Sequence, residues 1–142
     1  MIVMVAHLDF FPHWQRKGFL RFNLIWLETP SNPLLQVVDI EQIALQAKSI
    51  NSLVAVDNTF LSPALQNPLM LGADIVVHST TKYINGHSDI VGGAAITNNE
   101  EILQKLKYWA NNIGLTGSPF DSYLILRGLR TLGIRMEKHE VE

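Results

Sequence analysis

The chain has 142 residues, the length of one domain or part of one, and 47% of them are hydrophobic, which is enough to bury a core. Its 11 Lys and Arg residues against 13 Asp and Glu residues give a net charge of −2, so the basic excess of a nucleic-acid-binding surface is missing. The absence of cysteine excludes disulfides, CxxC redox motifs and thiolate metal sites. No apolar run approaches the roughly 20 residues that cross a bilayer, and we expect a cytoplasmic protein without a membrane partner.

Residues 1–21 differ from the rest of the chain. The stretch Phe10–Arg21 mixes aromatic and basic side chains without a regular strand or helix period. An anchor at a membrane surface is one interpretation, because aromatic and cationic groups sit well among lipid headgroups. We favour a leader that is poorly ordered or results from a mis-called start. The expected organisation is therefore a leader at residues 1–21 and a partial domain at residues 22–142.

From residue 22 onward the pattern is regular and predicts a β-α-β unit. Leu24–Leu27 is a predicted strand, followed by a loop in which two prolines disfavour helix. Asp39 is the predicted N-cap of a helix, with Gln42 three residues further on as in a capping box. Leu53–Val56 is the next predicted strand. The apolar face of the helix is formed by Ile40, Ile43, Ala44, Ala47 and Ile50.

A second crossover is predicted after this unit. It consists of a loop over Asn58–Pro63, a short helix at about Pro68–Leu71 that stops at Gly72, and a strand at Ile75–Val77. Ile90–Ile96 is predicted to be a further strand, in which glycine and alanine allow close approach of backbone or ligand. The alternation of strands and helices indicates an α/β fold.

Helices are predicted for the remainder of the chain. Asn98 caps one that runs to about Asn111, and Ser118 with Pro119 starts another that runs to about Arg130. The last ten residues look like part of a further helix. The apolar side of the first of these helices is formed by Ile102, Leu103, Leu106 and Trp109.

Polar side chains with complementary chemistry follow two successive predicted strands. Asp57 follows the strand Leu53–Val56, and Ser79-Thr80-Thr81-Lys82 follows the strand Ile75–Val77. Buried parallel strands present their carboxyl ends at one edge of a sheet, and ligands of open α/β sheets bind there. We therefore expect these groups to form one small-molecule site.

Pyridoxal 5'-phosphate matches this set of groups. A lysine forms an imine with the cofactor aldehyde when its ammonium can lose a proton, and Lys82 suits that role. A carboxylate keeps the ring nitrogen protonated, so that the ring draws electrons from the substrate, and Asp57 suits that role. Ser79 and Thr81 can bind the phosphate, and they share one face of an extended segment while Thr80 points away.

Taken singly, each of these residues has a plainer interpretation. A lone aspartate after a strand usually caps a helix, a lone lysine is usually solvated, and Ser-Thr-Thr could be an ordinary turn. Their combination at two strand ends favours the functional interpretation. His78, His87 and Asp89 could suggest a metal site, but structural hydrogen bonding is the interpretation that we favour. The arginines of the last helices are expected to be solvated or paired rather than to clamp a substrate: Arg127, Arg130 and Arg135.

Three motifs together resemble those of one enzyme family. They are ETPSNP at residues 28–33, VDNT at residues 56–59 and HSTTKYINGHSD at residues 78–89. Over about residues 22–140 the chain resembles the Cys/Met-metabolism family of pyridoxal-phosphate enzymes, the transsulfuration group. The resemblance implies the central part of the large domain of a fold-type I pyridoxal-phosphate enzyme, with a mostly parallel sheet flanked by helices.

The resemblance also implies roles for individual residues. It makes Lys82 the catalytic residue, which binds the cofactor covalently and moves protons between substrate carbons. It adds Asn32 as a hydrogen-bond partner of the cofactor's ring hydroxyl and Thr59 as a residue that packs against the ring. The implied cofactor-binding set is Asn32, Asp57, Thr59, Ser79, Thr81 and Lys82.

Within the family, the segments WANNIGLTG at residues 109–117 and FDSY at residues 120–123 most resemble those of bacterial cystathionine γ-synthases. The implied reaction joins an activated homoserine ester, usually O-succinylhomoserine, to cysteine by γ-replacement. Cystathionine lyases, homoserine-ester sulfhydrylases and methionine γ-lyases share the core motifs and stay open as alternatives. The implied partners are small-molecule amino-acid substrates and further copies of the chain in a dimer or tetramer.

Members of this family are much longer than 142 residues. Their preceding part supplies a stacking tyrosine and further phosphate ligands, and their following part supplies the arginine that grips the substrate carboxylate. None of these can be assigned in this chain, so we expect the isolated polypeptide to be inactive. The second hypothesis is accordingly a non-catalytic protein that binds only the cofactor or a partner subunit.

Overall fold

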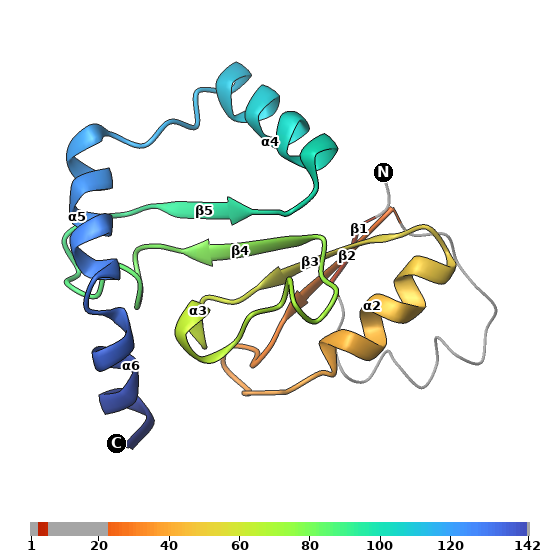
Figure 1. Cartoon of the computed structure of the whole chain (residues 1–142), viewed down its shortest axis with the longest axis horizontal. Helices are drawn as coiled ribbons and strands as arrows, with labels where there is room; N and C mark the ends of the chain where they lie inside the picture. The colour runs from red at the N-terminus through yellow and green to blue at the C-terminus, as the bar shows by residue number, and fades with distance from the viewer. Residues whose placement is uncertain (1–2, 6–22, 142) are drawn as a thin grey trace.

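A five-stranded sheet lies at the centre of the structure, a computed structural model that describes residues 3–5 and 23–141 (Figure 1). The strands are β1 (Val3–Val5), β2 (Leu24–Glu28), β3 (Leu53–Asp57), β4 (Ile75–Ser79) and β5 (Gly93–Ile96). They lie side by side in this order. Strands β1 to β4 are parallel, and β5 runs antiparallel to β4. The predicted mostly parallel α/β sheet is confirmed.

Five helices connect or follow the strands within the described part of the chain. They are α2 (Ile40–Ser49), α3 (Ser62–Leu65), α4 (Glu100–Asn112), α5 (Pro119–Leu129) and α6 (Leu132–Val141). Helix α2 covers one face of the sheet, and α5 and α6 follow one another past the end of β4 (Figure 1). Among the described residues, no helix combines the length and apolar character needed to span a bilayer.

The main core lies between α2 and the sheet. Ile25 and Leu27 alternate along β2, Val54 and Val56 alternate along β3, and all four point toward α2 because side chains of a strand alternate between faces. Four of the five residues predicted for the apolar face of α2 are buried, Ile40, Ile43, Ala44 and Ala47, whereas Ile50 is the partly buried C-cap that follows the helix. Burying each large aliphatic side chain stabilises the fold by about 1.5–3 kcal/mol before entropy is counted.

The start of α2 has the predicted cap. The Asp39 carboxylate accepts a hydrogen bond of 2.9 Å from the Gln42 amide, which satisfies one of the free donors of the first turn. Ser118 caps α5 in the same way, with its hydroxyl accepting from the Asp121 amide at 3.0 Å and Pro119 in the first turn. Local side-chain chemistry therefore sets where these two helices begin.

The short helix of the second crossover lies earlier than predicted. Residues Pro68–Leu71 form turns, because the amides of Met70, Leu71 and Gly72 each bond the carbonyl three residues back rather than four. The helix is instead α3, which begins in the last two residues of the segment predicted as a loop and continues to Leu65. There the Ser62 hydroxyl accepts from the Ala64 amide at 3.2 Å and a proline occupies the first turn.

Other element boundaries differ by one to three residues, among them the starts of α4 and β5 and the ends of β2, β3 and β4. The cap of α4 is Asn99, not Asn98, because the Thr97 hydroxyl holds the Asn99 amide at 3.1 Å and keeps the chain non-helical one residue longer. Strand β5 begins at Gly93 rather than at Ile90, because the backbone of Gly92 is bonded to the loop after β4 instead of to a neighbouring strand. Of the predicted apolar side of α4, only Ile102 is buried and Trp109 is 60% exposed.

The predicted leader falls mostly outside the described residues. Val3–Val5 form β1, which pairs in parallel with β2, and residues 6–22 are not described. The division of the chain at residues 21 and 22 stays a prediction.

Candidate active site

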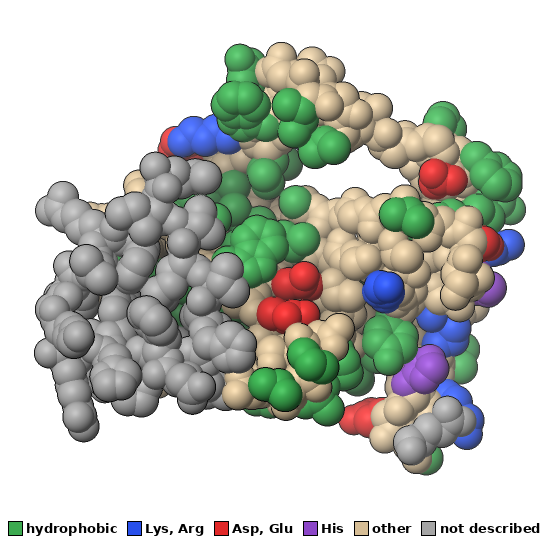
Figure 2. All heavy atoms as spheres, turned by 180° about the vertical axis from the view of Figure 1, so that it is seen from behind, with side chains coloured by type: hydrophobic (Ala, Val, Ile, Leu, Met, Phe, Trp, Pro, Cys, Tyr) green, Lys and Arg blue, Asp and Glu red, His purple; other side chains and the backbone are tan. Residues whose placement is uncertain are grey.

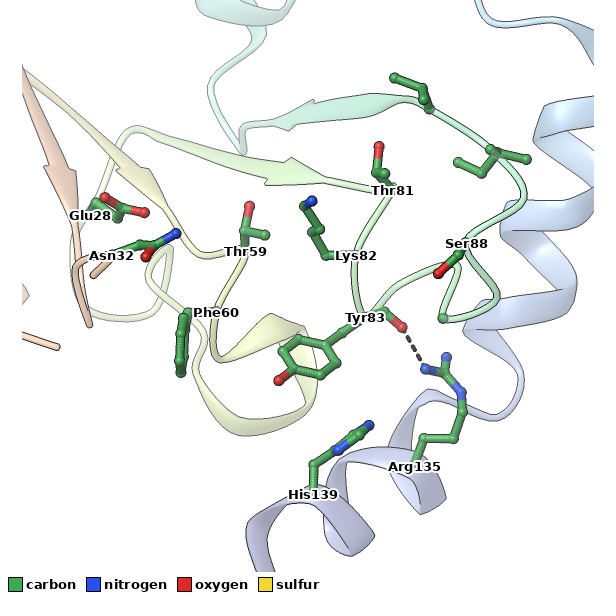
Figure 3. A pocket seen from close by; sticks show the side chains of 13 residues that line it. Glu28, Asn32, Thr59, Phe60, Thr81, Lys82, Tyr83, Ser88, Arg135 and His139 are labelled. Carbon is green, nitrogen blue, oxygen red and sulfur yellow. Dashed lines mark hydrogen bonds between the residues drawn. The ribbon is translucent and has the colours of Figure 1, made fainter. Parts of the chain in front are cut away.

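A cavity of about 700 Å³ opens at the carboxyl ends of β2, β3 and β4. This is the edge at which ligands bind in open α/β sheets. Its walls come from the loops after these strands, from the segment that leads into β5 and from α6 (Figure 3). It is lined by Glu28, Asn32, Thr59, Phe60, Thr81, Lys82, Tyr83, Gly86, Ser88, Ile90, Val91, Arg135 and His139.

Four of the six predicted site residues line this cavity: Asn32, Thr59, Thr81 and Lys82. They come from three different loops, and the fold brings them together. Asp57 and Ser79 are not among the lining residues and occupy the last positions of β3 and β4, directly before those loops. The predicted residues therefore gather at one edge of the sheet.

The sheet register sets the direction of the strand-end side chains. Glu28 pairs with Asp57, and Asp57 pairs with Val77, so these three side chains share one face with Ser79 two residues further along β4. That face is opposite to the one on which Val56 contacts α2. Seen from behind, the molecule carries acidic and basic side chains close together near its centre, bordered by apolar ones (Figure 2).

Asp57 is oriented by the turn that follows it. One carboxylate oxygen accepts a hydrogen bond of 3.0 Å from the Thr59 amide, and the side chain is half-buried. An aspartate commonly bonds the backbone two residues on in this way at a turn. Its second oxygen has no hydrogen-bond partner among the described residues, so the carboxylate is fixed in direction and still able to accept another bond.

The two predicted phosphate ligands, Ser79 and Thr81, differ in the hydrogen bonds that their hydroxyl groups make. The Thr81 hydroxyl accepts from the Gly92 amide at 2.9 Å and donates to the Gly92 carbonyl at 3.3 Å. The Ser79 hydroxyl has no partner in the described part of the chain and is half-buried. Thr80, predicted to point away from both, is buried, and its hydroxyl lacks a hydrogen-bond partner within the described residues. Among the described residues, the Ser79 hydroxyl is therefore available to a phosphate, whereas the Thr81 hydroxyl would have to give up its 3.3 Å bond to the Gly92 carbonyl in order to donate to one.

Lys82 presents an unpaired ammonium to the cavity. Its side chain is exposed, and within residues 3–5 and 23–141 it has no ion pair or hydrogen bond. The backbone around it is well defined, because the Lys82 amide donates to the Ser79 carbonyl at 3.3 Å and the Lys82 carbonyl accepts from the Gly86 amide at 2.7 Å. An amine without a counter-ion, held on a bonded turn, is available to bind a carbonyl compound.

A buried histidine lies directly before these residues. His78 is 2% exposed, and its Nδ1 atom has no hydrogen-bond partner in the described region. Burial lowers the pKa of His78, and this effect outweighs the nearby Asp57 charge and a backbone hydrogen bond with Asn58, both of which raise it. The neutral imidazole is therefore favoured, and the site gains no positive charge from it.

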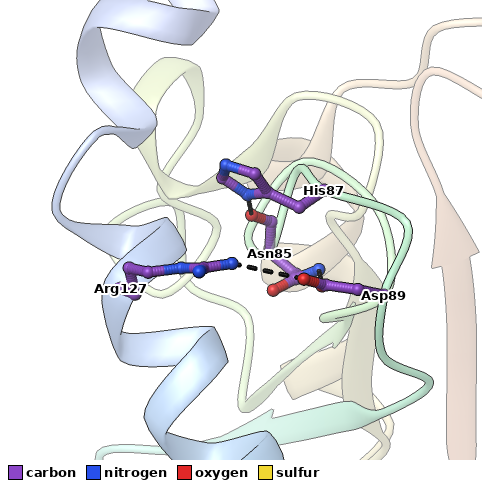
Figure 4. A network of polar contacts seen from close by, with 4 residues as sticks. All are labelled: Asn85, His87, Asp89 and Arg127. Atoms are coloured by element: carbon purple, nitrogen blue, oxygen red, sulfur yellow. Dashed lines mark hydrogen bonds and ion pairs between the residues drawn. The ribbon is translucent and has the colours of Figure 1, made fainter.

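Of the three residues that could suggest a metal site, His87 and Asp89 bond other residues, whereas His78 Nδ1 has no hydrogen-bond partner among the described residues. His87 Nδ1 lies 2.7 Å from the Asn85 carbonyl, and Asp89 bonds the Asn85 side chain at 2.6 Å and Arg127 at 3.2 Å (Figure 4). No cluster of three His, Cys, Asp or Glu side chains suited to a metal occurs among the residues described. These contacts join the loop after Lys82 to α5.

Several lining residues were not assigned a role from the sequence. Glu28 and Tyr83 lie in the quoted motifs, and their positions at a strand end and next to Lys82 were the available signals. Arg135 and His139 come from α6, and no local pattern marks them as pocket residues. The Tyr83 and His139 rings lie 5.1 Å apart at the mouth of the cavity (Figure 3).

Comparison with known proteins identifies the family. The sequence profile of the family described as "Cys/Met metabolism PLP-dependent enzyme" matches residues 5–142. The chain belongs to this family of pyridoxal-phosphate-dependent enzymes. The cofactor expected from the strand-end residues is thereby confirmed at the level of the family.

Individual members of the Cys/Met metabolism family are close to this chain in sequence and structure. Cystathionine gamma-synthase of Escherichia coli (strain K12) is 61% identical over 115 residues, which cover 81% of this chain and 30% of that protein. Cystathionine gamma-lyase of Dictyostelium discoideum is 59% identical over 118 residues, which cover 83% of this chain and 30% of that protein. A solved structure also matches: the crystal structure of cystathionine gamma synthase from Xanthomonas oryzae pv. oryzae in complex with cystathionine. It superimposes with a TM-score of 0.78 at 47% identity, and the match covers 92% of this chain and 41% of that one.

These relatives bear both synthase and lyase names at similar identity. The family assignment is therefore firm, while the names do not separate the reactions that its members catalyse. The chain spans about 30% of the length of the curated relatives it matches.

Proposed function

We propose that this chain carries the cofactor-binding core of a transsulfuration enzyme that performs γ-replacement. The reaction would join O-succinylhomoserine, or a similar ester, and cysteine to give cystathionine. The observation that carries the proposal is the cavity at three strand ends, where Lys82 lies with Asn32, Thr59 and Thr81 and, among the described residues, has no ion pair or side-chain hydrogen bond. Asp57 occupies the last position of one of these strands.

The donor set of the site supports binding of pyridoxal phosphate. The amine of Lys82 suits the aldehyde, and the free Asp57 oxygen suits a protonated ring nitrogen. The unengaged Ser79 hydroxyl suits the phosphate, with Thr81 joining it if its 3.3 Å bond to Gly92 opens. The exposed amide of Asn32 suits the ring hydroxyl. Each cofactor group therefore has a matching residue in or next to the cavity.

Bound pyridoxal phosphate would supply an electron sink for charge that develops on substrate carbon. The chain's own residues would do the remaining work. The Lys82 Nζ atom would bind the aldehyde and carry protons, Asp57 would orient the ring by its nitrogen, and Thr59 would hold Asp57 through its amide at 3.0 Å. The apolar lining residues Phe60 and Ile90 would limit the access of water to the cavity.

One feature supports synthase chemistry over that of the other family members. Residues 109–117 and 120–123 resemble those of bacterial cystathionine γ-synthases. The proposal is consistent with a relative of that name at 61% identity and with the matched Xanthomonas oryzae structure, which is described as a complex with cystathionine. Because a relative named as a lyase is 59% identical, cleavage of cystathionine is the second candidate reaction.

Trapping the cofactor tests the first part of the proposal. The chain is mixed with pyridoxal phosphate, reduced with borohydride and digested, and the modified peptide is identified by mass spectrometry. We expect one dominant adduct on Lys82 that Lys82→Ala abolishes. Lys107→Ala is the matched control, because Lys107 is an exposed lysine of α4 that does not line the cavity. Equal labelling of Lys82 and Lys107 would show that the site does not hold the cofactor.

Product analysis tests the reaction. The chain with cofactor is given O-succinylhomoserine and cysteine in one sample and cystathionine in another. Cystathionine formed in the first sample supports γ-replacement, whereas a 2-oxo acid and ammonia released in the second support a lyase. An adduct on Lys82 without either product would leave a cofactor-binding chain that does not turn over by itself.

We also propose that the chain assembles with further copies of itself, as a dimer or tetramer, in the cytoplasm. Large exposed apolar side chains along α4 and α5 support this, among them Trp109, Phe120 and Tyr123. Exposed apolar patches of this kind commonly mark protein–protein contacts. Sedimentation of the purified chain tests the proposal, and a monomer at all concentrations would contradict it.

A further inference from the structure

The guanidinium of Arg135 holds the backbone of the turn that carries Lys82. Its Nη1 atom donates to the Tyr83 carbonyl at 2.7 Å, and its Nη2 atom donates to the Ile84 carbonyl at 3.3 Å. The side chain reaches from α6 toward the residue next to Lys82 (Figure 3). Two successive peptide groups after Lys82 are thus bonded to one rigid cation.

The same guanidinium is itself held in place by the preceding helix end. Arg135 Nη2 also donates to the Gly128 carbonyl at 2.8 Å, and Nε donates to the Thr131 hydroxyl at 3.0 Å. An arginine has five N–H donors in a fixed fork, so these contacts use nearly all of them. The bonds to Gly128 and Thr131 therefore fix the orientation in which the guanidinium bonds the turn.

The turn fits closely around this cation. A β-carbon at Gly86 would force the Arg135 guanidinium to shift, and Gly86 has a φ of +73°, which side-chain-bearing residues rarely adopt. The amide of Gly86 donates to the Lys82 carbonyl at 2.7 Å, which closes the turn. Arg135 thus contacts the turn through both hydrogen bonds and packing.

The geometry argues against two other roles for Arg135. A carboxylate clamp needs two parallel free N–H groups, and those of Arg135 are taken up by carbonyls. A solvated surface arginine would look like Arg130, whose exposed side chain has no hydrogen bond or ion pair in the described part of the chain. Arg135 instead is half-buried and pairs with backbone.

We propose that Arg135 is a positioning residue for Lys82. By fixing the peptide groups of Tyr83 and Ile84, it gives the Lys82 amine one backbone conformation from which to enter the cavity. A flexible lysine on a loose turn would have to lose that freedom on every binding event, which weakens binding. This inference rests on the proposed carbonyl-binding role of Lys82.

The test compares Arg135→Gln and Arg135→Lys with two controls. Arg130→Gln removes a neighbouring arginine without such contacts. Leu132→Val loosens the apolar contact of α6 with Ile84 and keeps the guanidinium. For each variant we measure the melting temperature, the pH profile of borohydride-trappable pyridoxal phosphate on Lys82, and, without cofactor, acetylation of Lys82 relative to Lys107.

We expect Arg135→Gln to form the Lys82 adduct about tenfold more weakly, since misplacing a reacting group is costly. Its pH profile and its Lys82-to-Lys107 acetylation ratio should also shift. Arg135→Lys should recover part of the effect, because an ammonium can bond one carbonyl but not the full set. Arg130→Gln should match the unmodified chain, and Leu132→Val should melt earlier with trapping and acetylation unchanged.

Two results would overturn the inference separately from the proposed function. If Arg135→Gln leaves the acetylation ratio unchanged, Arg135 does not position Lys82, whether or not the cofactor binds. If Arg135→Gln and Leu132→Val weaken trapping equally for the same loss of melting temperature, its role is only structural. A third outcome separates the two proposals. If the unmodified chain forms no adduct but Arg135→Gln still shifts the acetylation ratio, the proposed function is rejected and the positioning role is retained.

Discussion

The hydroxyl of Thr59 accepts a hydrogen bond of 2.7 Å from the backbone amide of Ser79. This contact joins the end of β3 to the end of β4, across 20 residues of sequence. The amide of Thr59 also donates to Asp57 at 3.0 Å. One threonine therefore sets the position of the carboxylate on one strand and of the hydroxyl-bearing residue on the next.

Thr59→Val should destabilise the chain more than its small change in shape suggests. The substitution keeps the volume but leaves the part-buried Ser79 amide without its acceptor, at a cost of about 1–3 kcal/mol. Urea unfolding followed by circular dichroism measures the free energy of unfolding. Thr59→Ser keeps the hydroxyl and should retain most of the stability. Thr116→Val, at an exposed position, is the control, and an equal loss in both valine variants would contradict the assignment.

Gly128→Ala should destabilise the contact between α5 and the Lys82 turn. A methyl group there would clash with the Asn85 and Ile84 carbonyl oxygens and lie 2.8 Å from Asn85 Cα, and backbone atoms cannot move aside cheaply. We expect a loss of about 1–3 kcal/mol in the free energy of unfolding, as for other overpacked sites. Gly133→Ala on α6 meets nothing within 4 Å and should be neutral or stabilising by about 1 kcal/mol. Similar effects of the two changes in thermal unfolding would disprove the close contact.

The stability of the chain should fall on acidification through the histidine range. Burial lowers the pKa of His78 from 6.5, so below that pH the unfolded chain binds a proton that the folded chain resists. Stability is therefore full above about pH 6.5 and decreases as the pH falls toward the lower folded value. Urea unfolding at several pH values between about 7 and 5 measures this slope. His78→Gln should flatten it, and an unchanged slope in that variant would assign the effect to other groups.

Asn85 should lower the pKa of Asp89 more than Arg127 does. The hydrogen bond of 2.6 Å from the Asn85 amide is the largest cause that holds the pKa of Asp89 below 3.8, and the Arg127 charge adds to it (Figure 4). Asn85→Ala should therefore raise the pKa of Asp89 toward 3.8 further than Arg127→Gln does. NMR titration of the side-chain carboxyl carbon of Asp89 measures its pKa in both variants. The reverse ranking would mean that the ion pair dominates.

Local chemistry in the sequence was sufficient to predict much of this fold. The apolar runs predict β2, β3 and β4, because strands of a parallel sheet typically are continuous hydrophobic stretches. The side chains of Asp39 and Ser118 predict where two helices start, because capping involves residues only three apart. The positions of Asp57 and Lys82 at strand ends follow directly from these elements, which is why the chemistry of the site could be read in advance.

The tertiary structure decided what surrounds that lysine. Arg135 reaches the Tyr83 carbonyl across 52 residues, and no periodicity or motif links the two positions. The Thr81 hydroxyl is bonded to Gly92, whereas that of Ser79 has no partner within the described part of the chain, although the sequence pattern predicts the same role for both. Sequence patterns predict the side chains that lie on one face or at one end of a helix or strand. Contacts between distant segments depend on how the elements pack, and only the folded chain determines them.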